Sequence, residues 1–184
     1  MRFIQKKQLH FFCIFLLLIF LPACFAGIQK QGSVLDYHQG RVKTEGGSFL
    51  VSPLPPVWQQ QKIDYRAVLF TNAADQATIT IDAWCRRATD DSSLLVQTNQ
   101  LLQGIQNLHV TQQTKAMLAK RATLITEAYG FIDGRKIFIT TTVLKMNACV
   151  FDFIYVSVPE KLQSHDDYQQ MVNGFKYIKG PKLL

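Results

Sequence analysis

The chain has 184 residues, of which 48% are hydrophobic and 18% charged, and its formal net charge is +7. This length allows one ordinary domain with a short appendage and excludes a (β/α)8 barrel of about 250 residues. The apolar fraction excludes a compositionally disordered chain.

The first residues have the pattern of a secretory signal. Arg2, Lys6 and Lys7 precede the unbroken apolar run Phe11 to Leu21. A helix of that length rises only about 16 Å, too short for a hydrocarbon core of about 30 Å. A charged start, a short apolar run and small residues after it predict an export signal rather than a buried helix.

Two processing routes fit the residues that follow. Residues 21–24 read Leu-Pro-Ala-Cys, which resembles the lipobox of bacterial lipoproteins, although Pro22 is unusual there. On that route the signal is 1–23 and Cys24 is lipidated. Alternatively, Cys24-Phe25-Ala26 is a small-x-small site for general signal peptidase, and the signal is 1–26. Both routes predict an exported protein of the bacterial periplasm, either soluble or anchored to a membrane through a lipidated Cys24.

The chain has four cysteines, and processing leaves Cys85 and Cys149 in the folded part on either route. In an oxidising compartment, two such cysteines in one small domain favour a disulfide. The alternative is two separate buried thiols, which are common core residues. No histidine stands at ligand spacing from either cysteine, so we expect no metal site and no cofactor.

Residues 27–47 show no sustained hydrophobic periodicity and contain several glycines. We therefore predict a flexible arm or tether at 27–47, one domain at 48–178 and a basic tail at 179–184.

In the first half of the domain, β-rich runs predict strands at 49–51, 65–71 and 77–85. Prolines 53, 55 and 56 end the first strand, and Trp58 is expected in a turn at the core edge. Thr89-Asp90-Asp91 offers N-cap chemistry for a helix. Its expected apolar stripe comprises Leu94, Leu95, Leu101, Leu102 and Ile105. A short strand is predicted at 109–114.

The second half is more strongly β. Runs at 121–131 and 135–145 flank Asp133-Gly134, a strong signal for a hairpin turn. The run 148–159 is apolar on both faces, which predicts a central strand covered on both sides. Ser164 is a candidate N-cap for a closing helix, whose apolar face comprises Tyr168, Met171, Val172 and Phe175.

This order predicts an α+β fold, a mostly antiparallel β-sheet with helices packed on it. The layout resembles the Mog1/PsbP-like domains, including small bacterial envelope proteins of that group. The resemblance covers residues 48–178. In the first half it depends on an entry strand followed by Pro53 and Trp58 and on a helix after the third strand. In the second half it depends on the Asp133-Gly134 hairpin, an apolar strand ending at Pro159 and an aromatic closing helix ending at Phe175. It implies an α/β/α sandwich and an accessory or binding role rather than catalysis.

Catalytic motifs are absent from the sequence, and we expect no catalytic residue. His38, His109 and His165 are each expected at the surface. Asp82 and Asp152 lie on predicted strands, where they either face one another as paired carboxylates or take solvent-facing positions.

Six basic residues form the weak candidate for a charged patch. They are Arg86, Arg87, Lys120, Arg121, Arg135 and Lys136. A merged patch suits an anionic membrane surface or an acidic protein face, and export argues against nucleic acid. The alternative is scattered solubilising charge.

These features favour an exported, non-catalytic envelope module that binds an unknown envelope protein or assists complex assembly. The first alternative is a periplasmic carrier of a small or lipid-like ligand, which predicts an apolar pocket. An enzyme would need converging polar residues with perturbed pKa values in one cleft.

Overall fold

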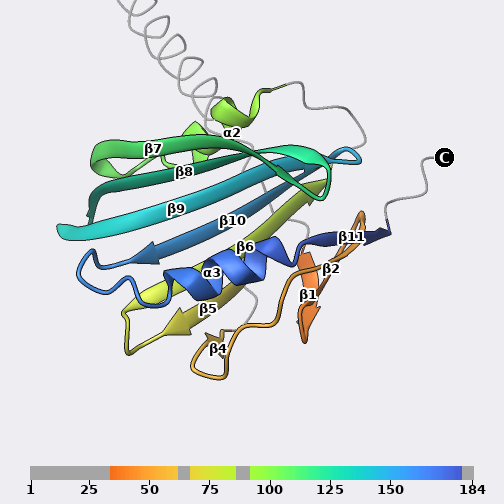
Figure 1. The fold of residues 1–184 in the computed structure, drawn as a ribbon, viewed down its shortest axis with the longest axis horizontal. Helices are drawn as coiled ribbons and strands as arrows, with labels where there is room; N and C mark the ends of the chain where they lie inside the picture. Colours follow the sequence, from red (N-terminus) through yellow and green to blue (C-terminus); the bar gives the residue numbers. More distant parts are fainter. Residues whose placement is uncertain (1–33, 62–66, 86–91, 180–184) are drawn as a thin grey trace, which may run out of the picture. The chain divides into compact units, whose positions relative to one another are not determined.

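The structure is a computed structural model that describes residues 34–61, 67–85 and 92–179. In this part of the chain, every pair of neighbouring strands is antiparallel. The strands form two sheets (Figure 1), a seven-stranded sheet in the order β4-β5-β6-β10-β9-β8-β7 and a four-stranded sheet in the order β1-β2-β3-β11.

The large sheet carries most of the β structure. Its strands are β4 (Gln59–Gln60), β5 (Val68–Asn72), β6 (Ala77–Cys85), β7 (Gln106–Leu118), β8 (Arg121–Ile132), β9 (Arg135–Met146) and β10 (Cys149–Ser157). The small sheet comprises β1 (Val34–His38), β2 (Arg41–Thr44), β3 (Gly47–Leu50) and β11 (Lys176–Lys179). The helices are α2 (Leu94–Leu101) and α3 (His165–Asn173).

Two-residue turns join β7 to β10 into a meander. The predicted turn at Asp133-Gly134 is confirmed, and both of its residues have positive φ, at 49° and 75°. Positive φ at both central residues matches the twist of the flanking strands. Ala119-Lys120 and Asn147-Ala148 make the equivalent turns between β7 and β8 and between β9 and β10.

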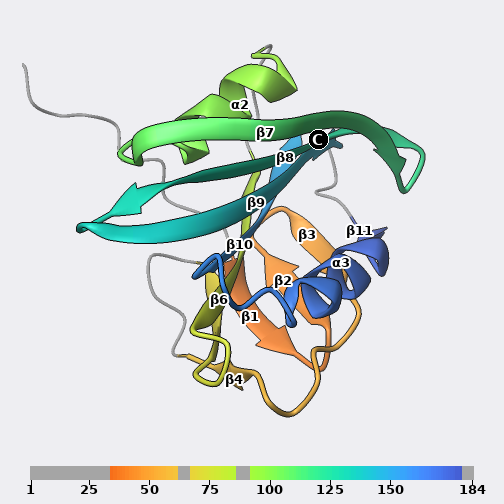
Figure 2. The ribbon, with the colours of Figure 1, turned by 60° about the vertical axis from the view of Figure 1, so that its left-hand side comes forward.

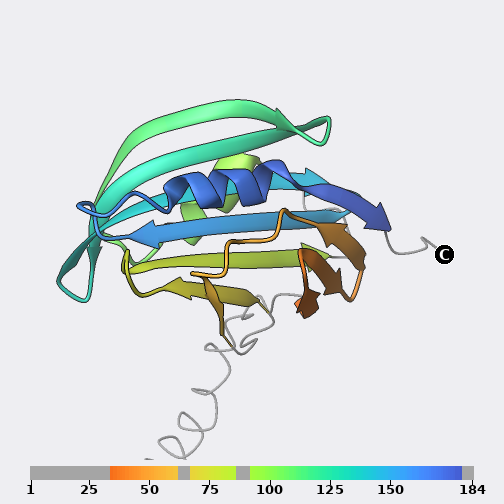
Figure 3. The same ribbon diagram turned by 60° about the horizontal axis from the view of Figure 1, so that its bottom comes forward.

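The prediction of a central strand covered on both faces is confirmed for β10. Its odd-numbered residues from Phe151 to Tyr155 belong to the main core, which α3 closes. Ile154 and Val156 point to the opposite face and pack in a second cluster with Leu102, just after α2. The two helices therefore lie on opposite faces of the large sheet (Figures 2 and 3), with the small sheet on the α3 side. This arrangement is the predicted α/β/α layering.

The closing helix has the predicted apolar face. Tyr168, Met171 and Val172 are buried, and Phe175 follows directly after the helix. The Tyr168 hydroxyl donates to Thr142 Oγ1 over 2.8 Å, which anchors α3 to β9. Ser164 is the N-cap residue, as predicted, but its hydroxyl is paired with the Tyr155 hydroxyl at 3.1 Å rather than capping the helix.

The predicted flexible arm at 27–47 is wrong from Val34 onward. This segment forms β1 and β2, and the side chains of Val34 and Val42 are at most 1% exposed. The strands are short and are joined by a tight turn in which Gln39 and Gly40 both have positive φ, so they leave no long periodic pattern in the sequence. The folded domain thus begins before residue 48.

The C-terminal boundary also differs, because β11 pairs with β3 and includes Lys179. That residue was predicted to begin the basic tail. The predicted signal and the rest of the tail lie outside the described residues. Trp58 is buried in a turn, as expected, and its Nε1 donates to Asp167 Oδ2 over 2.9 Å.

The helix α2 follows its predicted apolar stripe only just beyond its C-terminal end, where Leu102 is buried and Ile105 packs against the same cluster. Its buried residues are Gln97 and Thr98, whereas Leu95 and Val96 are 47% and 44% exposed. The cap also lies later than Thr89-Asp90-Asp91: the Ser93 hydroxyl accepts from Val96 N over 3.2 Å. Gln97 is buried with a hydrogen bond to Ser92 Oγ, just before the helix, whereas the Thr98 hydroxyl has no hydrogen-bond partner among the described residues.

Candidate functional site

The structure contains the Cys85–Cys149 disulfide. Cys85 ends β6 and Cys149 begins β10, and the two residues are direct cross-strand partners. Their Cα atoms are 4.0 Å apart. Because both cysteines are bonded, Cys149 offers no free thiol nucleophile.

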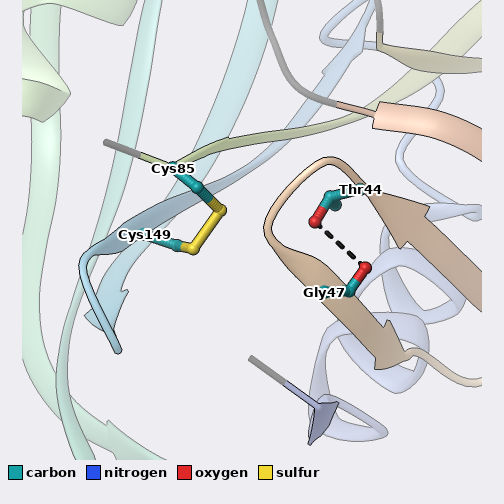
Figure 4. Close-up of a disulfide and its surroundings, with 4 residues drawn as sticks. All are labelled: Thr44, Gly47, Cys85 and Cys149. Atoms are coloured by element: carbon teal, nitrogen blue, oxygen red, sulfur yellow. Dashed lines mark hydrogen bonds between the residues drawn. A yellow bond between two sulfur atoms is a disulfide. The ribbon is translucent and has the colours of Figure 1, made fainter. Parts of the chain in front are cut away.

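The turn between β2 and β3 rests on this disulfide (Figure 4). A Cβ atom at Gly46 would lie 2.7 Å from Cys85 Sγ and 2.8 Å from Cys85 Cβ, closer than real Cβ contacts. Thr44 Oγ1 donates to Gly47 O over 3.1 Å and holds the turn in shape. The disulfide therefore joins two strands of the large sheet and supports one end of the small sheet.

Asp82 and Asp152 face one another, as one of the two sequence interpretations proposed. They are direct cross-strand partners on β6 and β10, on the face that α2 covers. Asp152 is only 8% exposed. Like charges directly opposite one another in a sheet are destabilising, so this pair weakens the fold when both carboxylates are ionised.

Burial raises the pKa of Asp82 to about 6, and a hydrogen bond to the Ala83 backbone opposes the rise. Its Oδ1 has no hydrogen-bond partner among the residues that the structure describes. Asp82 therefore takes up a proton under mildly acidic conditions. Neither carboxylate lines the cavity beside the β8–β9 turn.

Further polar groups lie around α2. Lys145 Nζ on β9 donates to Ser92 O, and Gln97 Nε2 donates to Ser92 Oγ. Thr98 and Thr141 are fully buried. This polar layer was not predicted from the sequence, because neither Lys145 nor Gln97 belongs to a recognisable motif.

The three histidines have different surroundings. His38 and His109 are exposed, as predicted. His165 is half-buried, and its ring packs against Phe138, Tyr155 and Tyr168. Its Nε2 is 2.9 Å from Thr140 Oγ1. Burial lowers the pKa of His165, while the negative charges of Glu127 and Asp166 oppose that shift. The predicted surface position of His165 is thus only half correct.

The predicted basic patch does not form as one surface. Lys120 and Arg121 lie at the β7–β8 turn, whereas Arg135 and Lys136 lie at the β8–β9 turn. The whole of β8 separates them, roughly 40 Å at about 3.4 Å per residue. Arg86, Arg87 and the lipidation candidate Cys24 lie outside the described residues. The four described members of the candidate patch therefore form two separate groups.

One cavity of about 450 Å³ opens beside the β8–β9 turn. It is lined by Ile132, Asp133, Arg135, Ile137 and Val156. The space between α3 and the large sheet is filled instead, because Phe153, Tyr155, Tyr168 and Phe175 pack there at 5% exposure or less.

Across residues 34–61, 67–85 and 92–179, no group of three or more His, Cys, Asp or Glu side chains could hold a metal ion. Within the same ranges no helix is both long and apolar enough to cross a membrane.

The outer strand β7 is the most open element of the large sheet. It is the terminal strand, pairs with β8 along one side, and is exposed at almost every residue. At the opposite end of the sheet, β4 has only two residues. Among the described residues, the large sheet thus has one long open edge.

No family model and no curated protein matches the sequence. Solved structures do match its fold. LpqN from Mycobacterium tuberculosis has a TM-score of 0.54 and 12% identity over 72% of this chain and 86% of its own. Cyanobacterial PsbP (CyanoP) from Synechocystis has a TM-score of 0.53 and 11% identity over 85% of this chain and 99% of its own. A Pseudomonas aeruginosa protein of unknown function has a TM-score of 0.51 and 12% identity over 83% of this chain and 99% of its own.

At these identities the likeness concerns the fold alone, and the antiparallel sheet with helices on both faces agrees with it. The chain therefore has the Mog1/PsbP-like fold that its sequence layout resembles.

Proposed function

We propose that this protein is an exported, non-catalytic module of the cell envelope that acts by binding a protein partner or assisting the assembly of a complex. The observation that carries the proposal is the long open edge at β7, which leaves backbone groups available to another chain. LpqN, which shares the fold, is involved in cell envelope biogenesis. The Cys85–Cys149 disulfide supports an oxidising, exported location.

The export signal and its processing belong to the same proposal. The signal is removed by one of two routes, either with lipidation of Cys24 or by cleavage before Gly27. Intact-mass measurement of the mature protein separates them. A species that begins at Cys24 with added acyl mass means a lipoprotein, and one that begins at Gly27 means a soluble periplasmic protein. Retention of residues 1–23 contradicts export through either route.

A pull-down from crosslinked envelopes tests the binding role. The full chain, tagged at its C-terminus, is expressed in the cells that make it and purified after crosslinking. The proposal predicts one protein recovered in near-stoichiometric amount, and its loss when β7 carries Gln112→Pro. Recovery of only abundant background proteins, unchanged by the substitution, argues against a protein-binding module.

The cavity beside the β8–β9 turn favours a second candidate, a carrier of a lipid-like ligand. Ile132, Ile137 and Val156 offer apolar contacts, and Arg135 offers a positive charge for an anionic headgroup. Native mass spectrometry of protein purified without detergent tests it. A bound amphiphile that is lost in Ile137→Asp supports the carrier. Ligand-free protein supports the binding module.

A further inference from the structure

The edge at β7 lacks most of the devices that protect edge strands from other chains. Such edges are usually short, or carry prolines and several charges. The strand β7 has thirteen residues, no proline and Lys115 as its single Lys or Arg, with no acidic residue. In an antiparallel ladder, alternate residues of an outer strand direct N–H and C=O groups away from their neighbour. These groups can pair with one more strand.

The regular part of the edge is its second half. Pairing with β8 is irregular between Gln106 and His109 and again between Val110 and Gln112. From Gln112 to Leu118 the register is continuous. An added strand of about seven residues therefore has an unbroken ladder available, next to the turn at Ala119-Lys120.

Charge on β7 and at the β7–β8 turn is positive, and the nearest acidic residue on β8 is Glu127, opposite Gln112 at the start of the regular ladder. From Ser92 to Thr126 the sequence contains no Asp or Glu, and its charged residues are Lys115, Lys120 and Arg121. All three are exposed. An added strand with acidic residues gains from this charge, whereas a second copy of β7 brings only positive charge to the seam.

Exposed apolar side chains lie on α2 and along β7, with Met117 in the regular half of the edge. In the described residues, five of the ten exposed large hydrophobic side chains belong to α2 and β7. They are Leu95, Val96, Leu108, Val110 and Met117. The helix α2 packs on β8 and β9, beside β7 in the sheet order (Figures 1 and 2). Apolar side chains near an open edge provide contacts for alternate residues of an added strand.

We propose that the Gln112–Leu118 edge of β7 binds an extended segment of a partner protein by strand addition, and that this segment carries acidic residues that meet Lys115, Lys120 and Arg121. The inference rests on the proposed protein-binding function and names its surface and the chemistry of the partner. The added strand extends the large sheet beyond β7.

Site-specific photo-crosslinking tests the inference in cells that make the protein. A photoreactive amino acid replaces Gln112 or Thr114 on β7, and the control positions are Lys43 on β2 and Glu160 after β10. All four positions are exposed. The expected result is at least about tenfold more crosslinking from the β7 positions, to one partner segment with an acidic extended sequence.

A charge variant adds a second measurement. Lys115→Glu is expected to lower the crosslink yield from Thr114 about tenfold, whereas the matched control Lys43→Glu leaves it unchanged. Retention of the Cys85–Cys149 bond and of the melting temperature shows that each variant is folded.

The outcomes separate this inference from the proposed function. Crosslinks to a partner protein from Lys43 or Glu160, with none from β7, overturn the strand-addition site and leave the protein-binding role intact. Crosslinks from β7 to a second copy, to another part of the same chain, or to a segment without acidic residues overturn the inference as well. Absence of crosslinks to another protein from all four positions counts against both.

Discussion

Gly46 and Cys85 lie so close that a Cβ atom at residue 46 would be 2.7 Å from Cys85 Sγ. The turn between β2 and β3 therefore fits against the disulfide without a side chain between them. Through this contact the covalent bond between β6 and β10 also supports the small sheet.

Gly46→Ala should destabilise the protein by about 1–3 kcal/mol, because an added methyl group overpacks a tight contact. Chemical denaturation measures the loss. In a Cys85→Ala/Cys149→Ala background the cost should be smaller, since the sulfur contact is gone while the contact with the Cβ atom of residue 85 stays. An equal cost in both backgrounds would show that the turn does not depend on the disulfide.

Reduction of the disulfide should lower the free energy of unfolding by about 4 kcal/mol, because the bond closes a loop whose ends are separated by 64 residues. Denaturation with and without a thiol reductant measures this change. Thiol counting on unfolded, unreduced mature protein provides the control. Free thiols at Cys85 and Cys149 would contradict the structure.

The Asp82 carboxyl should make stability fall as pH rises. Its folded pKa of about 6 lies above the usual value, so the folded state binds more protons than the unfolded state between about pH 4 and 6. The stabilising effect of the protonated Asp82 is complete below about pH 4 and lost above about pH 6. The free energy of unfolding should fall by about 2–3 kcal/mol across this range.

Asp82→Asn should therefore raise stability at pH 7 and reduce the difference between pH 4 and pH 7. Asp36→Asn, on the exposed part of β1, is the matched control and should leave that difference unchanged. Denaturant titrations at both pH values provide the comparison. If Asp82→Asn is less stable than the native protein at pH 7, the ionised carboxylate is stabilising and the stated sign is wrong.

Phe175→Ala should cost about 3–5 kcal/mol, because truncation of a buried aromatic ring leaves a cavity. The ring of Phe175 is 5% exposed, and its centroid lies 5.1 Å from that of Phe151 and 5.5 Å from that of Phe49. Ile178→Ala on β11 is the control, at 41% exposure, with an expected change within about 0.5 kcal/mol. A loss below about 1 kcal/mol for Phe175→Ala would mean that the end of α3 contributes little to the core.

Much of the large sheet was predictable because its strands and turns have clear local sequence patterns. Alternation identified β6 to the residue, and Asp133-Gly134 fixed the hairpin between β8 and β9. The double-sided apolar character of β10 indicated helices on both faces. The small sheet was not predictable in the same way, because β1 and β2 are five and four residues long and the core contacts of Val34 and Val42 come from distant strands.

The sequence predicted which strands carry the site residues, but not which of these residues become neighbours when the strands pair. The sequence placed Asp82 and Asp152 on two predicted strands, but it could not show that they are direct cross-strand partners. The burial of Gln97 could not be predicted. Its acceptor Ser92 also accepts from Lys145 on β9, a contact that exists only in the folded protein. The predicted basic patch does not form, because Lys120-Arg121 and Arg135-Lys136 lie at opposite ends of β8.

The proposed binding of a protein at the β7 edge can be followed by hydrogen–deuterium exchange of the full chain, free and in complex with the partner recovered by crosslinking. We predict slower exchange in Gln112–Leu118 of β7 upon binding, with unchanged exchange in β1 and β2. Unchanged exchange along β7, with protection elsewhere in the complex, would contradict the account.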